Sequence, residues 1–470
     1  MILISLLLLT LSAKTAQNHL LKDNYQLQYT KKPKKVKTLK ELFSQGEFYG
    51  RLRSHTFMYE WEKEKAQQDN HLLTALGSSF IFKSASMSHF DITAGFYFTH
   101  AYLLKGEVST LKSAKDTFSR FDSTNDKGKS LAVLGQAYLH YRNKYESEFR
   151  LGRQIVETFY TKSNDSKMIP NTFDGVVLDT KFDSMKVRLT YLLQQKLRDH
   201  AQFHAVLAYG DSTYTTARNP QFSENDDAAM HKGLTVANLV AAGLDPDAAL
   251  VTADIAFNVS KDTKLDIAAY TVKDLLSQVM AEVNYKVSKS KTTKVTAGIR
   301  YIRQIDKGAG EIGGASLEGK AQTAGYEDPD SLESQMLAAR MVTQYKNYSL
   351  NLGLSYVSDE ADLVTPWRGF PTAGYTRSMA RYNWEANTKS YRILLKHAAS
   401  KTKNSIEGSF LHTDADENKG EFDQDFYYLG CIFKTAKDMD LSWRLRLGYT
   451  DSQQTDADSL DGRLEINYLF

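Results

Sequence analysis

Arginine recurs at alternate positions in stretches of the chain that otherwise alternate between apolar and polar residues. Arg51 and Arg53 are two residues apart, and so are Arg444 and Arg446. A guanidinium group holds a carboxylate through two parallel hydrogen bonds. A row of arginines would therefore give an anionic solute several moderate binding sites, as conduction through a channel requires. Further arginines on such polar faces are Arg188, Arg300 and Arg392.

Each of these arginines needs an extended strand to fix the face on which it lies. In Tyr348–Tyr356, leucine and tyrosine occupy every second position, and small or polar residues lie between them. Leu441–Tyr449 repeats the pattern, with Arg444 and Arg446 opposite Trp443 and three leucines. Period-two alternation predicts strands with one apolar and one polar face. The same pattern occurs at residues 187–191, 279–287 and 464–470.

The direction of the apolar faces decides between a soluble sandwich and a membrane barrel. A soluble sandwich buries its apolar faces inside. Two observations favour the opposite arrangement. Aromatic residues stand at the ends of the apolar faces, as at Tyr348 and Tyr356, where their rings suit a membrane interface. The polar faces carry Arg and Glu, which need water around them. We therefore predict an all-β fold, a transmembrane antiparallel β-barrel.

The connections between the predicted strands alternate in length. Asn258–Lys264 and Val287–Thr293 are short, whereas Asp306–Ser331, Asp359–Arg377 and Thr413–Asp425 are long and rich in Gly, Asp and Ser. Outer-membrane barrels combine tight periplasmic turns with large external loops. The available length allows about 16 to 18 strands. Barrels of that size leave an aqueous channel.

The composition excludes several classes of protein. The 470 residues carry a formal net charge of +3, too balanced for a dedicated nucleic-acid binder, so we expect no nucleic-acid partner. The single cysteine, Cys431, excludes an intrachain disulfide and a cysteine-based metal site. After Leu11 there is no run of 18 apolar residues, so helical membrane spans are excluded.

The start of the chain indicates export. Met1–Leu11 is an apolar run with the length of a signal-peptide core, although no Lys or Arg precedes it. We predict a signal peptide over residues 1–13, with cleavage after Ala13 or, less favourably, after Ala16.

The mature chain would then have two parts. Residues 14–40 are polar and contain the basic run Lys31–Lys37, which predicts a periplasmic N-terminal linker. Residues 41–470 form the predicted barrel domain. The last strand ends on Phe470, which is similar to the signal read by the barrel assembly machinery. We therefore expect a location in the bacterial outer membrane, with that machinery, membrane lipid and lipopolysaccharide as partners.

Several separated segments resemble, in order, the OprD-like outer-membrane porin family. The likeness spans about residues 42–470, and its late segment resembles the family's epsilonproteobacterial members. The segments are Phe48–Arg53, Leu151–Gln154, Asn164–Gly175, 366–377, Tyr382–Thr388 and Arg463–Phe470.

The resemblance implies an 18-stranded barrel, trimeric or loosely associated, with an inward-folded constriction loop. It implies diffusion of small solutes, with preference for carboxylates such as amino acids or small peptides, past a ladder of basic residues. It places Arg153 at the approach to the constriction loop, and Asp165, Lys167 and Asp174 on the loop. Lys167 stands where many members carry Arg, and it offers a point charge in place of a planar fork.

Motifs for other chemistry are incomplete. Gly308–Gly313 fits a dinucleotide fingerprint, but the strand before it is amphipathic. Gly128–Ser130 lacks the earlier glycine of a phosphate loop. Asp414–Asn418 has calcium-ligand spacing with a misplaced glycine, which leaves a bound cation as the minor alternative to an acidic hairpin. We expect no catalytic residue, metal site or cofactor. A phospholipase-like barrel enzyme and a surface adhesin stay open as alternatives to a porin.

Overall fold

The computed structural model describes most of the chain. The described residues are 19–22, 24–65, 68–107, 111, 117–118, 129–143, 147–207, 231–365, 367–379, 381–399, 404–434 and 441–470. The predicted signal peptide, residues 1–13, and Ala16 lie outside them. In this part of the chain, no helix is both long and apolar enough to cross a membrane.

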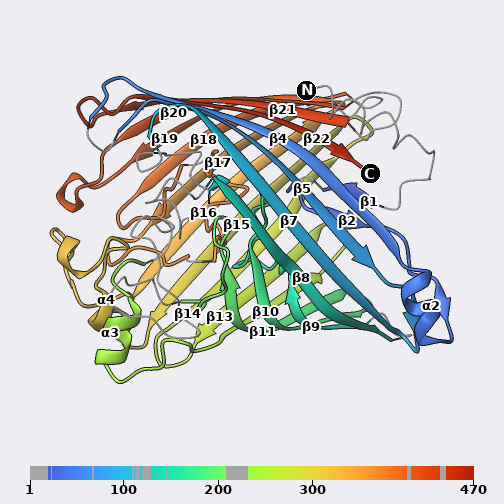
Figure 1. Cartoon of the computed structure of the whole chain (residues 1–470). Helices are drawn as coiled ribbons and strands as arrows, with labels where there is room; N and C mark the ends of the chain where they lie inside the picture. Colours follow the sequence, from blue (N-terminus) through green and yellow to red (C-terminus); the bar gives the residue numbers. More distant parts are fainter. Residues whose placement is uncertain are drawn as a thin grey trace.

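Eighteen long strands form a closed antiparallel barrel (Figure 1). Each strand pairs with the next long strand in the chain, and the last strand closes the ring against the first. The predicted fold class and strand number are therefore confirmed. The strands are β4 (Glu47–Trp61), β5 (His71–Lys83), β7 (Phe90–Lys105), β8 (Ser130–Arg142), β9 (Glu148–Gln154), β10 (Thr172–Phe182), β11 (Met185–Lys196), β12 (Leu250–Asn258), β13 (Thr263–Val272), β14 (Leu276–Lys289), β15 (Thr293–Asp306), β16 (Ser334–Tyr345), β17 (Tyr348–Val357), β18 (Lys389–Ala398), β19 (Ser405–Asp414), β20 (Gln424–Lys434), β21 (Leu441–Ser452) and β22 (Ser459–Leu469).

The apolar faces of the strands point away from the barrel axis. On β17, Tyr348 and Leu354 are 52% and 48% exposed, whereas Ser355 on the other face is 4% exposed. Exposed aromatic side chains lie near both ends of the strands, as Trp443 and Tyr449 do on β21. This distribution is the one that a lipid environment requires.

A charge placed on the outer face should destabilise the barrel strongly. Leu352 lies midway between Tyr348 and Tyr356 on the outer face of β17. We expect Leu352→Arg to cost about 2–4 kcal/mol of unfolding free energy, because the charge would lie near the bilayer midplane. The control Ser349→Arg places the same charge on the luminal face and should cost much less. Urea unfolding in lipid vesicles measures the difference, and equal losses would contradict the outward orientation.

The two ends of the barrel differ in their connections. One end, here called the short-turn end, has tight turns such as residues 183–184 between β10 and β11 and 346–347 between β16 and β17. The other, the loop end, has long connections such as 307–333 and 358–388. The predicted alternation holds for most connections, but two at the loop end are short: Lys273–Leu275 between β13 and β14, and residues 453–458 between β21 and β22.

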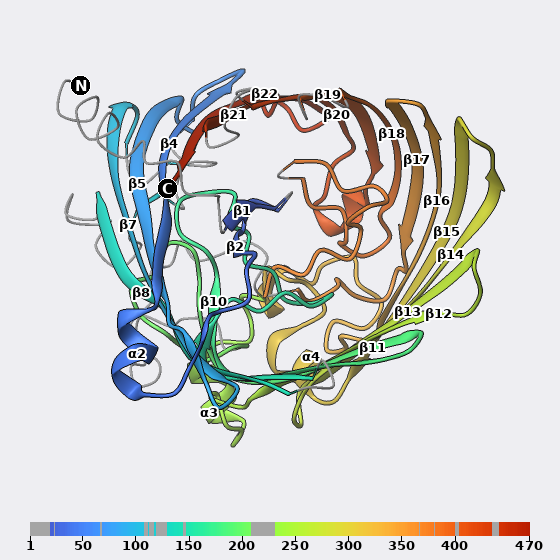
Figure 2. The ribbon, with the colours of Figure 1, turned by 90° about the vertical axis from the view of Figure 1, so that its right-hand side faces the viewer.

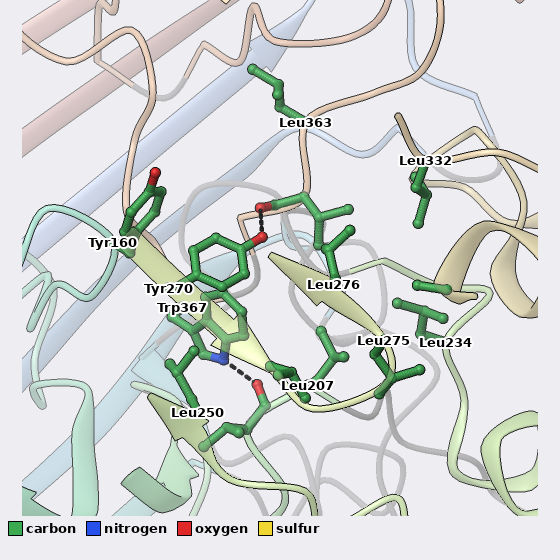
Figure 3. Close-up of a cluster of buried hydrophobic side chains, with 14 of the residues drawn as sticks. Tyr160, Leu207, Leu234, Leu250, Tyr270, Leu275, Leu276, Leu332, Leu363 and Trp367 are labelled. Atoms are coloured by element: carbon green, nitrogen blue, oxygen red, sulfur yellow. Dashed lines mark hydrogen bonds between the residues drawn. The ribbon is translucent and has the colours of Figure 1, made fainter. Parts of the chain in front are cut away.

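Long loops fold inward and cover part of the inner wall. Near the loop end, inward-facing Tyr270 and Leu276 pack against Leu234, Leu363 and Trp367 from these loops (Figure 3). The Tyr270 hydroxyl donates to the Val364 carbonyl oxygen at 3.3 Å. The inner wall is therefore apolar where loops cover it and charged elsewhere, a division that the strand alternation did not predict.

Shorter elements complete the fold. The helix α2 begins after Thr38, whose hydroxyl accepts from the backbone N–H of Glu41 while the Glu41 carboxylate accepts from that of Thr38. The small strands β1 and β2 pair only with each other and lie inside the ring (Figure 2). The elements are β1 (His19–Leu21), β2 (Leu27–Tyr29), β3 (Lys35–Val36), α2 (Leu39–Ser44), β6 (Ser86–Met87), α3 (Val236–Ala241), α4 (Ala309–Gly313), η4 (Lys320–Gln322) and η5 (Glu417–Lys419).

Candidate functional site: the lumen and its constriction loop

The connection between β9 and β10, residues 155–171, runs through the lumen and is here called the constriction loop. Its Asp165 carboxylate accepts two hydrogen bonds from Arg51 Nη2, at 2.8 and 2.9 Å, and one from Arg53 Nη1 at 3.1 Å. Arg51 and Arg53 lie on the inner face of β4 and are only 2% and 4% exposed. Both side chains therefore act as a clamp for the constriction loop. Their guanidinium groups are engaged by Asp165 and are not open to a solute.

The opposite end of the constriction loop is held on β12 and on a second loop. The Phe159 backbone N–H donates to Asp254 Oδ2 at 2.7 Å, and that of Lys162 donates to the Trp367 carbonyl oxygen at 3.3 Å. A Cβ atom at Gly369 would lie 2.2 Å from the Tyr160 carbonyl oxygen, so only glycine fits this contact. Since β12 is the seventh strand from β4 around the ring of eighteen, the loop crosses most of the lumen.

Three residues were predicted to lie on the constriction loop. The structure places Asp165 and Lys167 there, and it places Asp174 outside the loop. Asp165 and Lys167 lie on the loop, where Lys167 Nζ sits over the Phe57 ring, 4.5 Å from its centre. The Lys167 side chain is thus buried against the wall of β4. Asp174 belongs to strand β10, where its Oδ1 accepts from Arg153 Nε at 3.0 Å.

Arg153 lies on the outer face of β9, not on the luminal face. It has the same parity as Phe149 and Leu151, whose side chains are exposed on the outside of the barrel. The luminal arginine of this strand is Arg150, which pairs with Asp179 Oδ2 at 3.0 Å. The resemblance had placed Arg153, whereas the alternation of Phe149 and Leu151 would have selected Arg150.

Arg188 and Arg300 face the lumen in ion-paired groups. Arg188 Nε donates to Asp179 Oδ1 at 2.5 Å. Arg300 Nε donates to Glu282 Oε2 at 2.8 Å, and Glu282 Oε1 accepts from Arg340 Nη2 at 3.0 Å. Arg340 was missed, although it alternates with outward-facing Leu337 and Met341.

A mixed-charge cavity lies between these strands and the constriction loop. Its volume is about 660 Å³, and carboxylates and cations both line it. Among its lining residues are Glu157, Lys162, Asp179, Arg188, Asp254 and Arg300.

The strands β18 to β22 form a second charged stretch of the inner wall, here called the arginine wall, in which β19 and β20 lie between β18 and β21. Arg444 Nη2 donates to Glu465 Oε2 at 2.6 Å, and Arg463 pairs with Asp461. Arg446 differs, because its buried Nε and Nη2 have no hydrogen-bond partner among the described residues. In the same part of the chain, the buried Nε of Arg392 also lacks one. The arginine wall consists of Arg392, Arg444, Arg446 and Arg463.

No metal or nucleotide site emerges from the described residues. No group of three or more His, Cys, Asp or Glu side chains there could hold a metal ion. The glycine-rich segment that fits a dinucleotide fingerprint contains the short helix α4. The Asp306 carboxylate accepts from the backbone N–H groups of Gly308 and Gly310, at 2.9 and 3.2 Å, where a phosphate would have to bind.

The loop end contains carboxyl groups whose protonation should affect packing. Burial raises the pKa of Asp362, which accepts hydrogen bonds from the backbone N–H groups of Leu317 and Ala386. Burial and the nearby charges of Glu421 and Asp362 raise the pKa of Glu385.

We expect the packing of residues 358–388 to weaken as the pH rises. A folded-state pKa above the ordinary 4.5 means that Glu385 holds its proton longer in the packed loop than in an open one, so stability falls with increasing pH above that value. Hydrogen exchange, corrected for intrinsic rates, should show faster opening at pH 9 than at pH 6. Glu385→Gln should reduce this dependence, and a loop that opens less at pH 9 would contradict the prediction.

No protein-family model and no curated protein matches the chain. Solved structures do match it. OpdG of Pseudomonas aeruginosa aligns with a TM-score of 0.68 and 14% identity, over 91% of this chain and 99% of its own. OpdK of the same species aligns with a TM-score of 0.66 and 12% identity, again over 91% and 99%.

OccAB4 of Acinetobacter baumannii is a third match, with a TM-score of 0.66 and 12% identity over 90% of this chain and 98% of its own. These neighbours are porins of the OprD and Occ group. The chain has their fold. The barrel, the strand number and the luminal loops of this protein can therefore be described in the terms of a porin fold.

Proposed function

We propose that this protein is an outer-membrane porin through which small hydrophilic solutes diffuse. The observation that carries the proposal is a closed barrel with apolar side chains outside and charged side chains inside, crossed by one clamped loop. Lipid and water are the two environments that such a wall separates. The likeness in fold to solved porin structures supports the same proposal.

We infer further that the porin prefers solutes that carry a carboxylate. Arg446 supports this because two of its nitrogen atoms have no hydrogen-bond partner in the part of the chain that the structure describes, which leaves donors for an incoming anion. Arg392 offers one more such nitrogen on the same wall. The solved structure of OpdK, one of the neighbours, was determined with vanillate, itself a carboxylate.

The proposal includes a location and partners. Export by the signal peptide of residues 1–13 would deliver the chain to the outer membrane, where lipid and lipopolysaccharide would surround the barrel. We propose that the assembly machinery reads Phe470. This residue lies at the seam between the last and first strands, where its backbone N–H donates to the Gly50 carbonyl oxygen at 3.2 Å and its ring lies 5.5 Å from that of Phe80. A homotrimer and kinship with the epsilonproteobacterial members stay part of this proposal. Among the described residues, we find no observation that favours a phospholipase-like enzyme or an adhesin.

Liposome swelling tests the function and the preference together. Gluconate and mannitol are similar in size and differ in charge. We expect liposomes that contain the protein to swell in both solutes, and to swell faster in gluconate. Swelling no faster than that of protein-free liposomes would refute a porin, whereas equal rates in the two solutes would refute the carboxylate preference alone.

A further inference from the structure

The N-terminal strands β1 and β2 form a hairpin inside the barrel. Residues 19–22 and 24–29, here called the luminal hairpin, pair in the register His19 with Tyr29 and Leu21 with Leu27. Neither strand joins the barrel sheet, and Figure 2 shows both within the ring of strands. A two-stranded hairpin is at best marginally stable alone in water. Contacts with the barrel wall must therefore hold it in place.

The turn of the hairpin contacts arginines on two different strands through Tyr25. The Tyr25 carbonyl oxygen accepts from Arg51 Nη1 at 2.9 Å. The Tyr25 ring lies under the Arg444 guanidinium, with 3.5 Å between Cζ and the ring centre. Tyr25 has a φ of 65°, a left-handed conformation that is uncommon for a bulky residue. This conformation brings both its carbonyl group and its ring to the arginines.

The strands of the hairpin rest on the short-turn end of the wall. Leu27 is buried in a cluster with Tyr49 and Leu469. The Tyr29 hydroxyl donates to Glu47 Oε2 at 2.8 Å. Because Glu47 is the first residue of β4, the hairpin enters from the short-turn end and reaches inward to Arg51.

The chain that follows the hairpin is fixed, whereas the hairpin is incompletely packed. Strand β3 pairs with β6 on the barrel, and exposed Lys31 and Lys32 connect it to the hairpin. A cavity of about 200 Å³ separates the hairpin from the wall, between Tyr25 and Tyr428. Few contacts would therefore have to break for the hairpin to leave.

We propose that the luminal hairpin is a detachable plug of the short-turn mouth, held closed by Tyr25 on Arg51 and Arg444. This inference rests on the proposed porin function. The plug occupies the Arg444 face that an anionic solute would otherwise meet, so solute and plug compete for the same cation.

Single-channel recording of the full-length protein tests the plug. Two variants weaken the plug to different degrees: deletion of residues 19–29 removes the hairpin, and Tyr25→Ala removes only the ring that lies under Arg444. A hairpin that detaches and returns should close the parent channel briefly and repeatedly. Both variants should raise the mean open current and remove these brief closures. Gln28→Ala is the matched control, because Gln28 is exposed on the same hairpin, and it should behave as the parent. Parent-like currents in both test variants would overturn the plug and leave the porin function intact. Absence of current in both the parent and the deletion variant would overturn both proposals.

Thiol labelling gives a second readout that does not depend on conduction. In a Cys431→Ser background, the buried position of Leu27→Cys should react with a soluble maleimide about tenfold more slowly than the exposed Gln28→Cys, because labelling must await local opening. Adding Tyr25→Ala should remove most of that difference. Equal rates at both positions in the plugged parent would contradict a seated hairpin.

Discussion

The Asp165→Ala protein should form wider and less steady channels than the parent. Asp165 is the only carboxylate within 4 Å of Arg51 among the described residues, and it also pairs with Arg53. Removing it leaves a buried guanidinium without its counter-charge, which typically costs about 3–5 kcal/mol. The constriction loop would lose its ion pairs with β4 and keep only weaker contacts there, such as the hydrogen bonds from Arg53 to the backbone carbonyl oxygens of Asp165 and Lys167, so its hold on the centre of the lumen would loosen. Single-channel conductance should therefore rise, and hydrogen exchange in residues 155–171 should accelerate.

A matched control for this substitution lies on the outer face of the barrel. Asp174 also pairs with an arginine, Arg153, but both side chains are partly exposed. Such pairs contribute about 0–1 kcal/mol, so Asp174→Ala should leave conductance and loop exchange nearly unchanged. Parent-like conductance in folded Asp165→Ala protein would show that the clamp does not set the width of the channel.

Replacing Arg446 by alanine should lower the passage of carboxylates without unfolding the barrel. Arg446 lies near the positive charges of Arg444 and Arg463. The substitution therefore removes like-charge repulsion, and for this reason we expect the barrel to stay folded. Hydrogen bonds to charged groups contribute about 1.5–3 kcal/mol, which corresponds to about ten- to a hundredfold in affinity. The reversal potential in a salt gradient should shift toward cation selectivity, and gluconate uptake should fall.

Two comparisons make the Arg446 result specific. Arg446→Lys keeps the charge and loses the planar fork, so ion selectivity should be largely retained while gluconate uptake falls. Arg153→Ala removes an outward-facing arginine and should change neither quantity. Unchanged uptake in Arg446→Ala would remove Arg446 from the solute path. Arg444 cannot serve the same test, because it also holds Glu465 and Tyr25.

Much of the barrel could be predicted because each strand has one face in lipid and one in the lumen. The alternation in Tyr348–Tyr356 and Leu441–Tyr449 fixed both the strands and their orientation. The same rule, applied to Phe149 and Leu151, would have selected Arg150 in place of Arg153 as the luminal arginine of β9. Asp165 was identified only through a resemblance, since nothing local shows that a loop carboxylate meets β4.

The remaining features depend on contacts between distant segments. Arg51 is held by Asp165, which lies 114 positions away, and one partner of Arg300 is the Pro371 carbonyl oxygen, 71 positions away. Periodicity alone could therefore not distinguish a clamp from a solute site. Residues 14–40 were interpreted from their lysine run as a linker. The alternation of Tyr25, Leu27 and Tyr29 was the available signal for the luminal hairpin.

Single-channel recording of the purified protein in a planar lipid bilayer tests the central claim most directly. A water-filled lumen predicts discrete current steps whose size rises with potassium chloride concentration. The account requires such steps from a protein shown to be folded by its heat-modifiable migration in gels. A folded barrel that produces no steps at any salt concentration or voltage would contradict it.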